Sequence, residues 1–151
     1  MATNLNAPSL AVTLAYLALG SNVGDREDHL DKARRELRAK GVEIKRATEV
    51  VETEPFGVTE QPRFLNQVLE VEWPGDARQL LQTAKAVEQA VGRTETYRWG
   101  PREIDVDILL FGDEQAHDPD LEIPHPGLRE RDFFRRPLLE LRPDLAPILE
   151  P

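Results

Sequence analysis

The sequence predicts an α+β fold in which two amphipathic helices pack on one largely antiparallel sheet, and three observations carry this prediction. The 151 residues correspond to one domain of ordinary size. Apolar residues make up 40% of the chain and charged residues 31%, which is enough apolar material for one hydrophobic core. Strand and helix patterns follow one another in the order β-α-β-β-α-β before a proline-rich tail.

The first half of the chain contains a strand, a helix, a second strand and a loop. Residues 12–19 are apolar on both faces, which is typical of a buried central strand. After a glycine-bearing turn, Asp25 has the character of an N-cap for a helix over residues 25–40. Residues 42–53 alternate and predict one strand exposed on one side. Residues 54–64 contain two prolines and a glycine, so they predict a loop.

The second half repeats the pattern and completes the fold. Residues 65–73 predict a third strand, and a capped helix follows over residues 76–92. Residues 94–103 are polar and predict a second loop, and residues 104–111 predict a fourth strand. The tail predicts turns and one or two short helices. This order is that of a ferredoxin-like βαββαβ sandwich, a mostly antiparallel four-stranded sheet with helices packed on it and extra C-terminal elements.

Composition excludes several classes of protein. The chain has no cysteine, so disulfides, thiolate metal sites and cysteine nucleophiles are impossible. No apolar run approaches the roughly 18 residues of a membrane span, and no basic residue precedes Arg26, as a signal peptide requires. A net charge of −9 disfavours nucleic acid and anionic membranes as partners. We expect a cytoplasmic monomer with a single catalytic domain over residues 1–151, of which residues 1–11 are flexible.

Two aspartates on the predicted fourth strand are the first candidates for chemistry. Asp105 and Asp107 share one face of the strand, with Cα atoms roughly 6.6 Å apart, because side chains alternate along a strand. Ile108 and Leu110 belong to the alternate set and are expected to face the core. Mg²⁺ binds one or two carboxylates together with water and substrate phosphates. Taken alone, however, a solvated strand face explains the pair better.

Basic and aromatic residues add weaker signals. Seven arginines lie in the second half of the chain, at positions 93, 98, 102, 129, 131, 135 and 136. Guanidinium groups fit phosphate oxygens, although a surface salt bridge is the simpler explanation for any single arginine. His125 lies between two prolines and is expected to be rigid and exposed. The aromatic residues at loop edges, Phe64, Trp99, Phe133 and Phe134, either form a slot for a planar heterocycle or plug the core.

The segment at residues 98–110, RWGPREIDVDILL, resembles the signature of the 6-hydroxymethyl-7,8-dihydropterin pyrophosphokinases, enzymes of folate biosynthesis. Three other segments match in the same order: AYLALGSNVGD at 15–25, TEPFGVTEQPRFLN at 53–66 and LEIPHPGLRERDF at 121–133. The resemblance spans roughly residues 14–145. It implies the ferredoxin-like fold and the transfer of pyrophosphate from ATP to the hydroxymethyl group of the pterin, with release of AMP.

The resemblance also implies roles for the matching positions. The catalytic positions are Arg93, Arg102, Asp105 and Asp107, with two Mg²⁺ ions held by Asp105 and Asp107. The positions implied for ATP are Glu88, Arg93, Trp99, Arg102, Ile108, His125 and Arg131. The positions implied for the pterin are Thr53, Glu54, Pro55, Phe56, Phe64, Asn66 and Phe133, with the rings of Phe64 and Phe133 on either side of it.

Two other functions remain as alternatives. One is a Mg²⁺-dependent phosphotransferase that uses the same aspartates on another substrate, against which the pterin-slot residues argue. The other is a non-catalytic module that binds a nucleotide or a pterin. Retention of both aspartates and both matching arginines argues against this second alternative, because a binding module has no need to place metal ions beside a phosphate.

Three positions depart from the family pattern. Glu95 stands where many relatives have a loop arginine, Phe64 replaces a common tyrosine, and Pro126 follows His125 where an aromatic or polar residue is usual.

We predict that Glu95→Arg changes the affinity for nucleotide, because a reversed charge on a loop that reaches the phosphates alters their binding. Calorimetric titration of wild type and variant with a non-hydrolysable ATP analogue measures this change. Equal affinities would show that Glu95 points away from the nucleotide.

Overall fold

The structure of the protein is a computed structural model that describes residues 11–57, 60–94 and 100–150. The flexibility expected of residues 1–11 is not tested, because residues 1–10 lie outside the described ranges. The main sheet contains β1 (Thr13–Ser21), β2 (Glu43–Ala47), β3 (Val51–Thr53), β4 (Phe64–Trp73) and β5 (Asp105–Phe111). Its order is β2-β4-β1-β5, with β3 also paired to β4, and these pairings are antiparallel. The predicted ferredoxin-like arrangement is confirmed.

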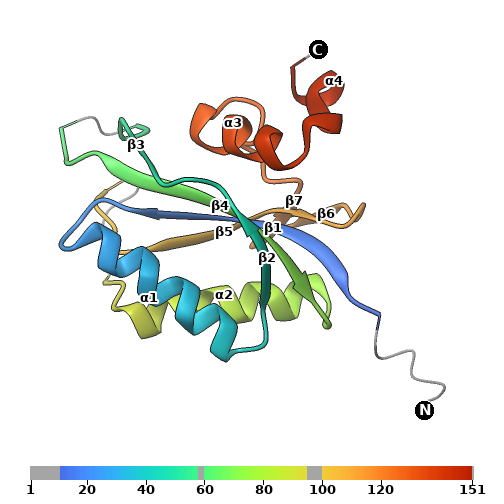
Figure 1. The fold of residues 1–151 in the computed structure, drawn as a ribbon, viewed down its shortest axis with the longest axis horizontal. Helices are drawn as coiled ribbons and strands as arrows, with labels where there is room; N and C mark the ends of the chain where they lie inside the picture. Colours follow the sequence, from blue (N-terminus) through green and yellow to red (C-terminus); the bar gives the residue numbers. More distant parts are fainter. Residues whose placement is uncertain (1–10, 58–59, 95–99, 151) are drawn as a thin grey trace.

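Helices cover both faces of this sheet (Figure 1). Two helices, α1 (Arg26–Ala39) and α2 (Ala77–Val91), pack on one face over the main core. Two others, α3 (Asp132–Leu141) and α4 (Ala146–Leu149), lie over the opposite face and cover a smaller core around Val68 and Leu138. The central strand β1 is apolar on both faces, as predicted, because both of its faces are covered.

The predicted helix starts are confirmed by their caps. The Asp25 side chain accepts a hydrogen bond from the backbone N–H of Asp28. At the second helix, Asp76 accepts from the N–H of Gln79, whose side chain accepts in return from the N–H of Asp76. The helix ends at Gly92, whose φ of 114° lies in the left-handed region that favours glycine. This stop directs the chain from α2 straight into the segment that carries the predicted phosphate-binding arginines.

The prediction of one continuous strand over residues 42–53 is wrong, because the segment divides into β2 and β3. The hydroxyl of Thr48 accepts the N–H of Val68 at 3.0 Å, and the N–H of Thr48 donates to the Val68 carbonyl at 3.0 Å. A side chain thus takes a hydrogen bond that a continuing strand would make from its backbone. Between Ala47 and Val51 the chain gains one residue relative to β4 before pairing resumes.

The expectation that Leu110 faces the main core is also wrong. The register between β1 and β5 shifts between Tyr16 and Leu17, which is the signature of a β-bulge. Beyond the shift, Phe111 lies in the main core, whereas Leu110 is half-buried against the smaller core on the other face.

The C-terminal segment contains a hairpin that the sequence did not predict. It consists of β6 (Ala116–Asp118) and β7 (Leu121–Ile123), which pair antiparallel. The Ile123–Pro124 peptide bond is cis. A 3₁₀ turn (Pro143–Leu145) lies between α3 and α4, so the expected short helices of the tail are confirmed. In the part of the chain that the structure describes, no helix is long and apolar enough to span a bilayer.

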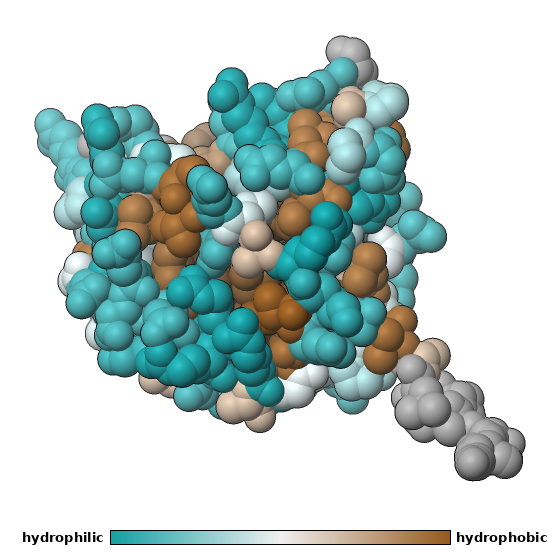
Figure 2. Space-filling model, viewed as in Figure 1, coloured by the Kyte–Doolittle hydropathy of each residue, from teal (hydrophilic) through white to brown (hydrophobic). Residues whose placement is uncertain are grey.

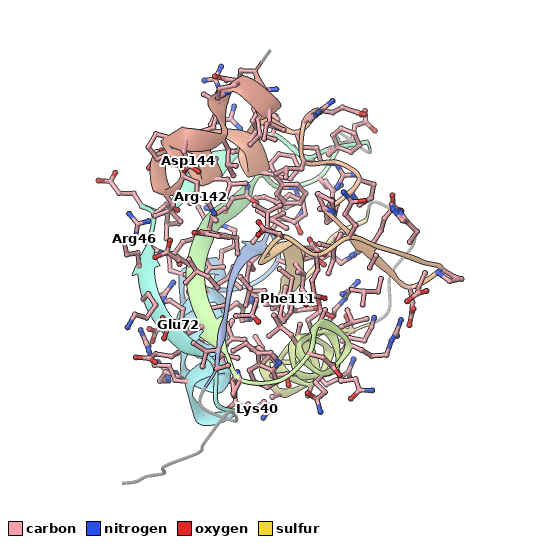
Figure 3. The ribbon with its side chains drawn as sticks, turned by 90° about the vertical axis from the view of Figure 1, so that its right-hand side faces the viewer. Lys40, Arg46, Glu72, Phe111, Arg142 and Asp144 are labelled. Atoms are coloured by element: carbon pink, nitrogen blue, oxygen red, sulfur yellow. The ribbon has the colours of Figure 1, made fainter. Side chains whose placement is uncertain are left out.

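A buried carboxylate links the sheet to α3. Glu70 of β4 is 7% exposed and accepts hydrogen bonds from Tyr16 Oη at 2.6 Å and from Arg46 Nε and Nη2 at 3.0 and 2.8 Å. Arg46 Nη2 also donates to the Leu141 carbonyl, at 2.8 Å, at the end of α3. Figure 3 shows Arg46 near Arg142, where the edge of the sheet meets the C-terminal segment. Hydrogen bonds from Arg46 hold the pKa of Glu70 below its usual value despite burial.

We predict that Arg46→Met lowers the free energy of unfolding at neutral pH, because it leaves the buried Glu70 carboxylate without its cation. Urea denaturation measures this loss. The matched control is Lys45→Met on the same strand, whose acidic partners Glu43 and Glu72 are more exposed than Glu70. This control is expected to change stability by less than about 0.5 kcal/mol.

The same contact predicts a pH dependence. Since the pKa of Glu70 is depressed in the folded state, its stabilising contribution is present at neutral pH and is lost as the pH falls through the folded-state pKa. The difference in stability between wild type and Arg46→Met should therefore narrow below the ordinary carboxyl pKa of 4.5. A difference that stays constant from about pH 7 to about pH 3 would contradict this account.

Candidate active site

The floor of the candidate site is the face of the sheet that lies toward α3. Gly20 of β1 pairs with Asn66 of β4 on one side and with Asp105 of β5 on the other. Ala18, two residues earlier, pairs with Asp107. Asn66 and Asp105 are therefore two strand spacings apart, about 9–10 Å, with a glycine between them.

Gly20 is needed here because of its neighbours. A Cβ at this position would lie 3.1 Å from Asn66 Oδ1 and 3.5 Å from a ring carbon of Phe64. The first of these distances is shorter than ordinary van der Waals contact, so a larger residue would push Asn66 aside. The glycine therefore keeps the floor open next to Asn66.

A cavity of about 340 Å³ opens above this floor. It lies between the segment around β3 and the start of α3, where the outline of the molecule is notched (Figure 2). The predicted site residues that line it are Thr53, Glu54, Phe56, Phe64, Asn66, Glu88, Arg93, Arg102, Asp105, Asp107, His125, Arg131 and Phe133. Residues from distant parts of the sequence, implied for two different substrates, thus share one cavity.

The remaining predicted residues are not brought to the cavity. Ile108 is buried in the main core, on the face of the sheet opposite to Asp107, so its side chain does not line the cavity. Pro55 is buried and does not line it either. Trp99 lies outside the described residues, as does Glu95.

Two arginines and two carboxylates meet at the start of β5. Arg102 Nη1 lies 2.9 Å from Asp105 Oδ1, and Arg93 Nη1 lies 3.4 Å from the same oxygen. Arg93 also pairs with Glu88 Oε1 at 2.9 Å. The other Glu88 oxygen accepts the N–H of Val106 at 2.8 Å, which helps to satisfy a carboxylate that is 7% exposed. Both guanidinium groups are thus gathered at one carboxylate, beside the cavity.

Negative charge is crowded at this end of the cavity. Burial, together with the nearby Asp105 and Glu88 carboxylates, raises the pKa of Asp107 to about 7. Burial also raises the pKa of Glu88. A divalent cation at Asp105 and Asp107 would offset this repulsion, and two carboxylates are the usual protein share of a Mg²⁺ site. Within the described ranges no group of three or more His, Cys, Asp or Glu residues forms a metal-binding cluster, so substrate oxygens and water would have to complete the coordination.

His125 is half-buried rather than exposed as expected. Its ring lies edge-on to Phe134, with centroids 4.8 Å apart, and Nδ1 accepts the N–H of Gly127 at 2.9 Å. Burial lowers the pKa of His125 to about 4, so the imidazole is neutral at physiological pH. Because Nδ1 accepts a hydrogen bond, the proton resides on Nε2. His125 therefore offers a neutral N–H donor at the cavity.

Aromatic rings form the wall next to α3. Phe133 packs edge-to-face against Phe56, at 6.4 Å between centroids, and against Phe134, at 4.8 Å. The Arg131 guanidinium carbon lies 4.4 Å from the centre of the Phe56 ring. Phe64 lines the cavity beside Gly20. The cavity is therefore bordered by the rings of Phe56 and Phe134 in addition to those of Phe64 and Phe133, the two implied for the faces of the pterin.

Asn22 is a residue of the site region that the sequence analysis missed. It is 1% exposed, and its Oδ1 accepts the N–H of Arg102 at 2.8 Å while its own N–H donates to the Arg102 carbonyl at 3.0 Å. Its Nδ2 donates to Gln61 Oε1 at 2.8 Å and to the Pro62 carbonyl at 3.0 Å. One side chain thus joins the two segments that carry the implied pterin and phosphate positions. An amide in a glycine-bearing turn after a buried strand was the available signal.

Other residues of the lining were also missed. They are Ala18, Leu19, Gly20, Leu81, Lys85, Gly100, Val106 and Asp120, whereas the lining also includes Phe134, one of the candidate aromatic residues. Leu81 and Lys85 lie seven and three residues before Glu88, which is the spacing of one helix face, so helical periodicity from Glu88 would have found them. Asp120 belongs to the unpredicted hairpin, for which no such signal existed.

Sequence comparisons assign this chain to a family of transferases. The family profile of 7,8-dihydro-6-hydroxymethylpterin-pyrophosphokinase matches residues 16–143. The proteins named 2-amino-4-hydroxy-6-hydroxymethyldihydropteridine pyrophosphokinase from Aquifex aeolicus and Bacillus subtilis are 46% and 40% identical over 130 and 129 residues. These matches cover 86% and 85% of this chain and 81% and 77% of theirs. The Folate synthesis bifunctional protein, mitochondrial, of Pisum sativum is 41% identical over 125 residues, which are 83% of this chain and 24% of that protein. The chain belongs to the 7,8-dihydro-6-hydroxymethylpterin-pyrophosphokinase family.

We predict that Asn22→Ala speeds amide hydrogen exchange in both joined segments by roughly tenfold, the effect of losing about one hydrogen bond. Asn22→Asp keeps the acceptor for the Arg102 N–H but loses the donors to Gln61 and Pro62, so it should affect mainly the second segment. Exchange measured by mass spectrometry on peptides covering residues 60–66 and 100–104 separates the two. Equal patterns in the two variants would rule out the bridging role.

Proposed function

We propose that the cavity between the sheet and α3 is where this chain, a pyrophosphokinase of folate biosynthesis, transfers the terminal diphosphate of ATP to 6-hydroxymethyl-7,8-dihydropterin and releases AMP. The observation that carries the proposal is the pairing of Gly20 with Asn66 on one side and Asp105 on the other. The Asn66 amide can hydrogen-bond the edge of a heterocycle, and the Asp105 carboxylate can bind the metal ions of a metal–phosphate complex. The two side chains thus border the same small floor. The names of the family and of the relatives support the same reaction.

The pterin occupies the half of the cavity next to β3 and β4. Phe64 and Phe133 stack on the two faces of its ring, and Phe56 closes one edge. Asn66 donates from Nδ2 to Thr53 Oγ1, so its Oδ1, beside Gly20, is the atom that accepts from a ring N–H. The chain at residues 53–56, which includes Glu54 and Pro55, supplies backbone hydrogen bonds to the pterin edge.

The nucleotide occupies the half next to α2 and β5. Two Mg²⁺ ions, held by Asp105 and Asp107, supply charge neutralisation for the phosphate oxygens when bound. When the nucleotide binds, the guanidinium groups of Arg93 and Arg102 leave Asp105 and bind phosphate oxygens, which their forked shape fits. The remaining implied nucleotide contacts are Glu88, Trp99, His125 and Arg131. The neutral His125 donates from Nε2 and the charged Arg131 adds positive potential beside it.

The reaction asks the protein mainly for positioning. The pterin hydroxyl oxygen attacks the β-phosphorus and releases its proton to solvent, the bond to the oxygen that bridges the α and β phosphates breaks, and AMP leaves. The side chains above hold the two substrates in line and keep positive charge at the transferred group, which accounts for most of the rate acceleration in such reactions. The protein itself forms no covalent intermediate.

We also propose that the enzyme acts as a monomer, with one catalytic domain over residues 1–151, in the cytoplasm. The complete lack of cysteine is compatible with a reducing compartment. Most of the implied site residues line one cavity formed within a single copy of the chain, which supports activity without a partner subunit.

Product analysis tests the reaction. The protein is incubated with ATP, Mg²⁺ and 6-hydroxymethyl-7,8-dihydropterin, and AMP is separated from ADP. AMP that forms only in the presence of the pterin supports pyrophosphate transfer. ADP would instead indicate a phosphotransferase, and the absence of both products, with both ligands bound, would indicate a binding module.

We predict that Asp107→Ala lowers kcat by about 1000-fold or more, since it removes one of the two metal carboxylates and with it several kcal/mol of charge stabilisation. The melting temperature should not fall, because Asp107 contributes to the crowding of negative charge. The matched control is Asp113→Ala in the exposed turn after β5, which is expected to keep the wild-type rate. A near-normal rate in Asp107→Ala would contradict the metal assignment.

A further inference from the structure

We propose that Glu103 is a positioning residue that holds Arg93 and Arg102 at the separation the reaction requires. It does so through its hydrogen bonds to Thr94, which connect the residue after Arg102 to the residue after Arg93. The inference rests on the roles proposed above for the two arginines, but Glu103 itself is assigned no role by the resemblance or by the cavity lining.

The contact joins the Glu103 carboxylate to the backbone and the hydroxyl of Thr94. Glu103 Oε1 accepts the backbone N–H of Thr94 at 3.0 Å. The Thr94 hydroxyl lies 3.2 Å from Oε1 and 3.1 Å from Oε2 of the same side chain. Hydrogen bonds to an ionised acceptor are stronger than bonds between neutral groups. The two ends of the connection between α2 and β5 are therefore joined directly next to the arginines.

The backbone of each arginine is otherwise anchored to a different part of the fold. The N–H of Arg93 donates to the Glu88 carbonyl at 3.0 Å, so its backbone belongs to the end of α2. The backbone of Arg102 bonds to Asn22, in the turn that follows β1. The Glu103–Thr94 contact ties these two anchors to each other. Without it, the backbones at the two positions are linked only indirectly, through the intervening chain, the elements that anchor them and the side chains of Glu88 and Asp105.

The geometry connects this contact to the guanidinium groups. The Glu103 side chain contacts Thr94, whereas the side chain of Arg102, the residue before it, lines the cavity. The two guanidinium groups then converge on Asp105 Oδ1, at 2.9 Å for Arg102 and 3.4 Å for Arg93. A misplacement of a catalytic group by about 1 Å can cost about a hundredfold in rate. A small change in the spacing of the two arginines should therefore appear in kcat.

The contact is poorly placed to serve stability alone. Thr94 is exposed and Glu103 is half-buried, and polar contacts at such positions add little to the free energy of unfolding. A positioning role and a purely structural role therefore predict different results. The first predicts a loss of kcat with little change in melting temperature, and the second predicts that the two fall together.

The test compares truncating and conservative variants in the full-length protein. Glu103→Ala should lower kcat by about tenfold or more, with the Kd for a non-hydrolysable ATP analogue and the melting temperature close to wild type. Thr94→Val, which keeps the backbone N–H, should lower kcat less, and Thr94→Ser, which keeps the hydroxyl, should restore it. The double variant of Glu103→Ala and Thr94→Val should be no slower than Glu103→Ala, because the two changes break one contact. Glu114→Ala in an exposed turn is the control for loss of an acidic side chain.

The outcomes separate this inference from the proposed function. Arg93→Ala and Arg102→Ala are measured beside the other variants. If these are impaired while Glu103→Ala has wild-type kcat, the positioning role is wrong and the arginine roles stand. A joint fall of kcat, analogue affinity and melting temperature in Glu103→Ala would also overturn the positioning role. Wild-type rates in both arginine variants would overturn the arginine roles, and the role of Glu103 with them.

Discussion

The small side chains on the central strand are the constraint on which the site depends. Gly20 and Ala18 lie between the implied pterin residue of β4 and the paired carboxylates of β5, and their size leaves a cavity on an otherwise covered sheet. The antiparallel register places Asn66, in the pterin half of the cavity, about two strand spacings from Asp105, in the nucleotide half. The main core and its two helices hold that register from the opposite face.

Buried polar groups hold the parts of the site that lie outside the sheet, namely α3 and the two segments joined by Asn22. Glu70 and Arg46 fasten the end of α3, whose other end carries Phe133. Asn22 ties together the two segments that border the cavity. Each of these groups is satisfied by partners from distant parts of the chain, and such networks favour one arrangement of the chain over alternatives. The site thus combines an apolar scaffold with polar ties at the places where the chain is irregular.

Local patterns explain how much of this could be predicted from the sequence. The central strand, both helix caps and the shared face of Asp105 and Asp107 depend on residues close in sequence, and the structure confirms them. The break at Thr48, the register shift before Leu17 and the burial of His125 depend on partners far away in the chain, so no local pattern predicted them. The implied substrate residues came from the resemblance, and the fold brings most of them to one cavity.

The most direct test of the central claim is the affinity of Gly20→Ala for the pterin. The added methyl group would lie 3.1 Å from Asn66 Oδ1, on the pterin side of the floor. We expect the Kd for 6-hydroxymethyl-7,8-dihydropterin to rise by about tenfold or more, the cost of one displaced hydrogen bond, while the Kd for a non-hydrolysable ATP analogue stays the same. An unchanged pterin affinity in a folded variant would contradict the claim that this floor receives the pterin.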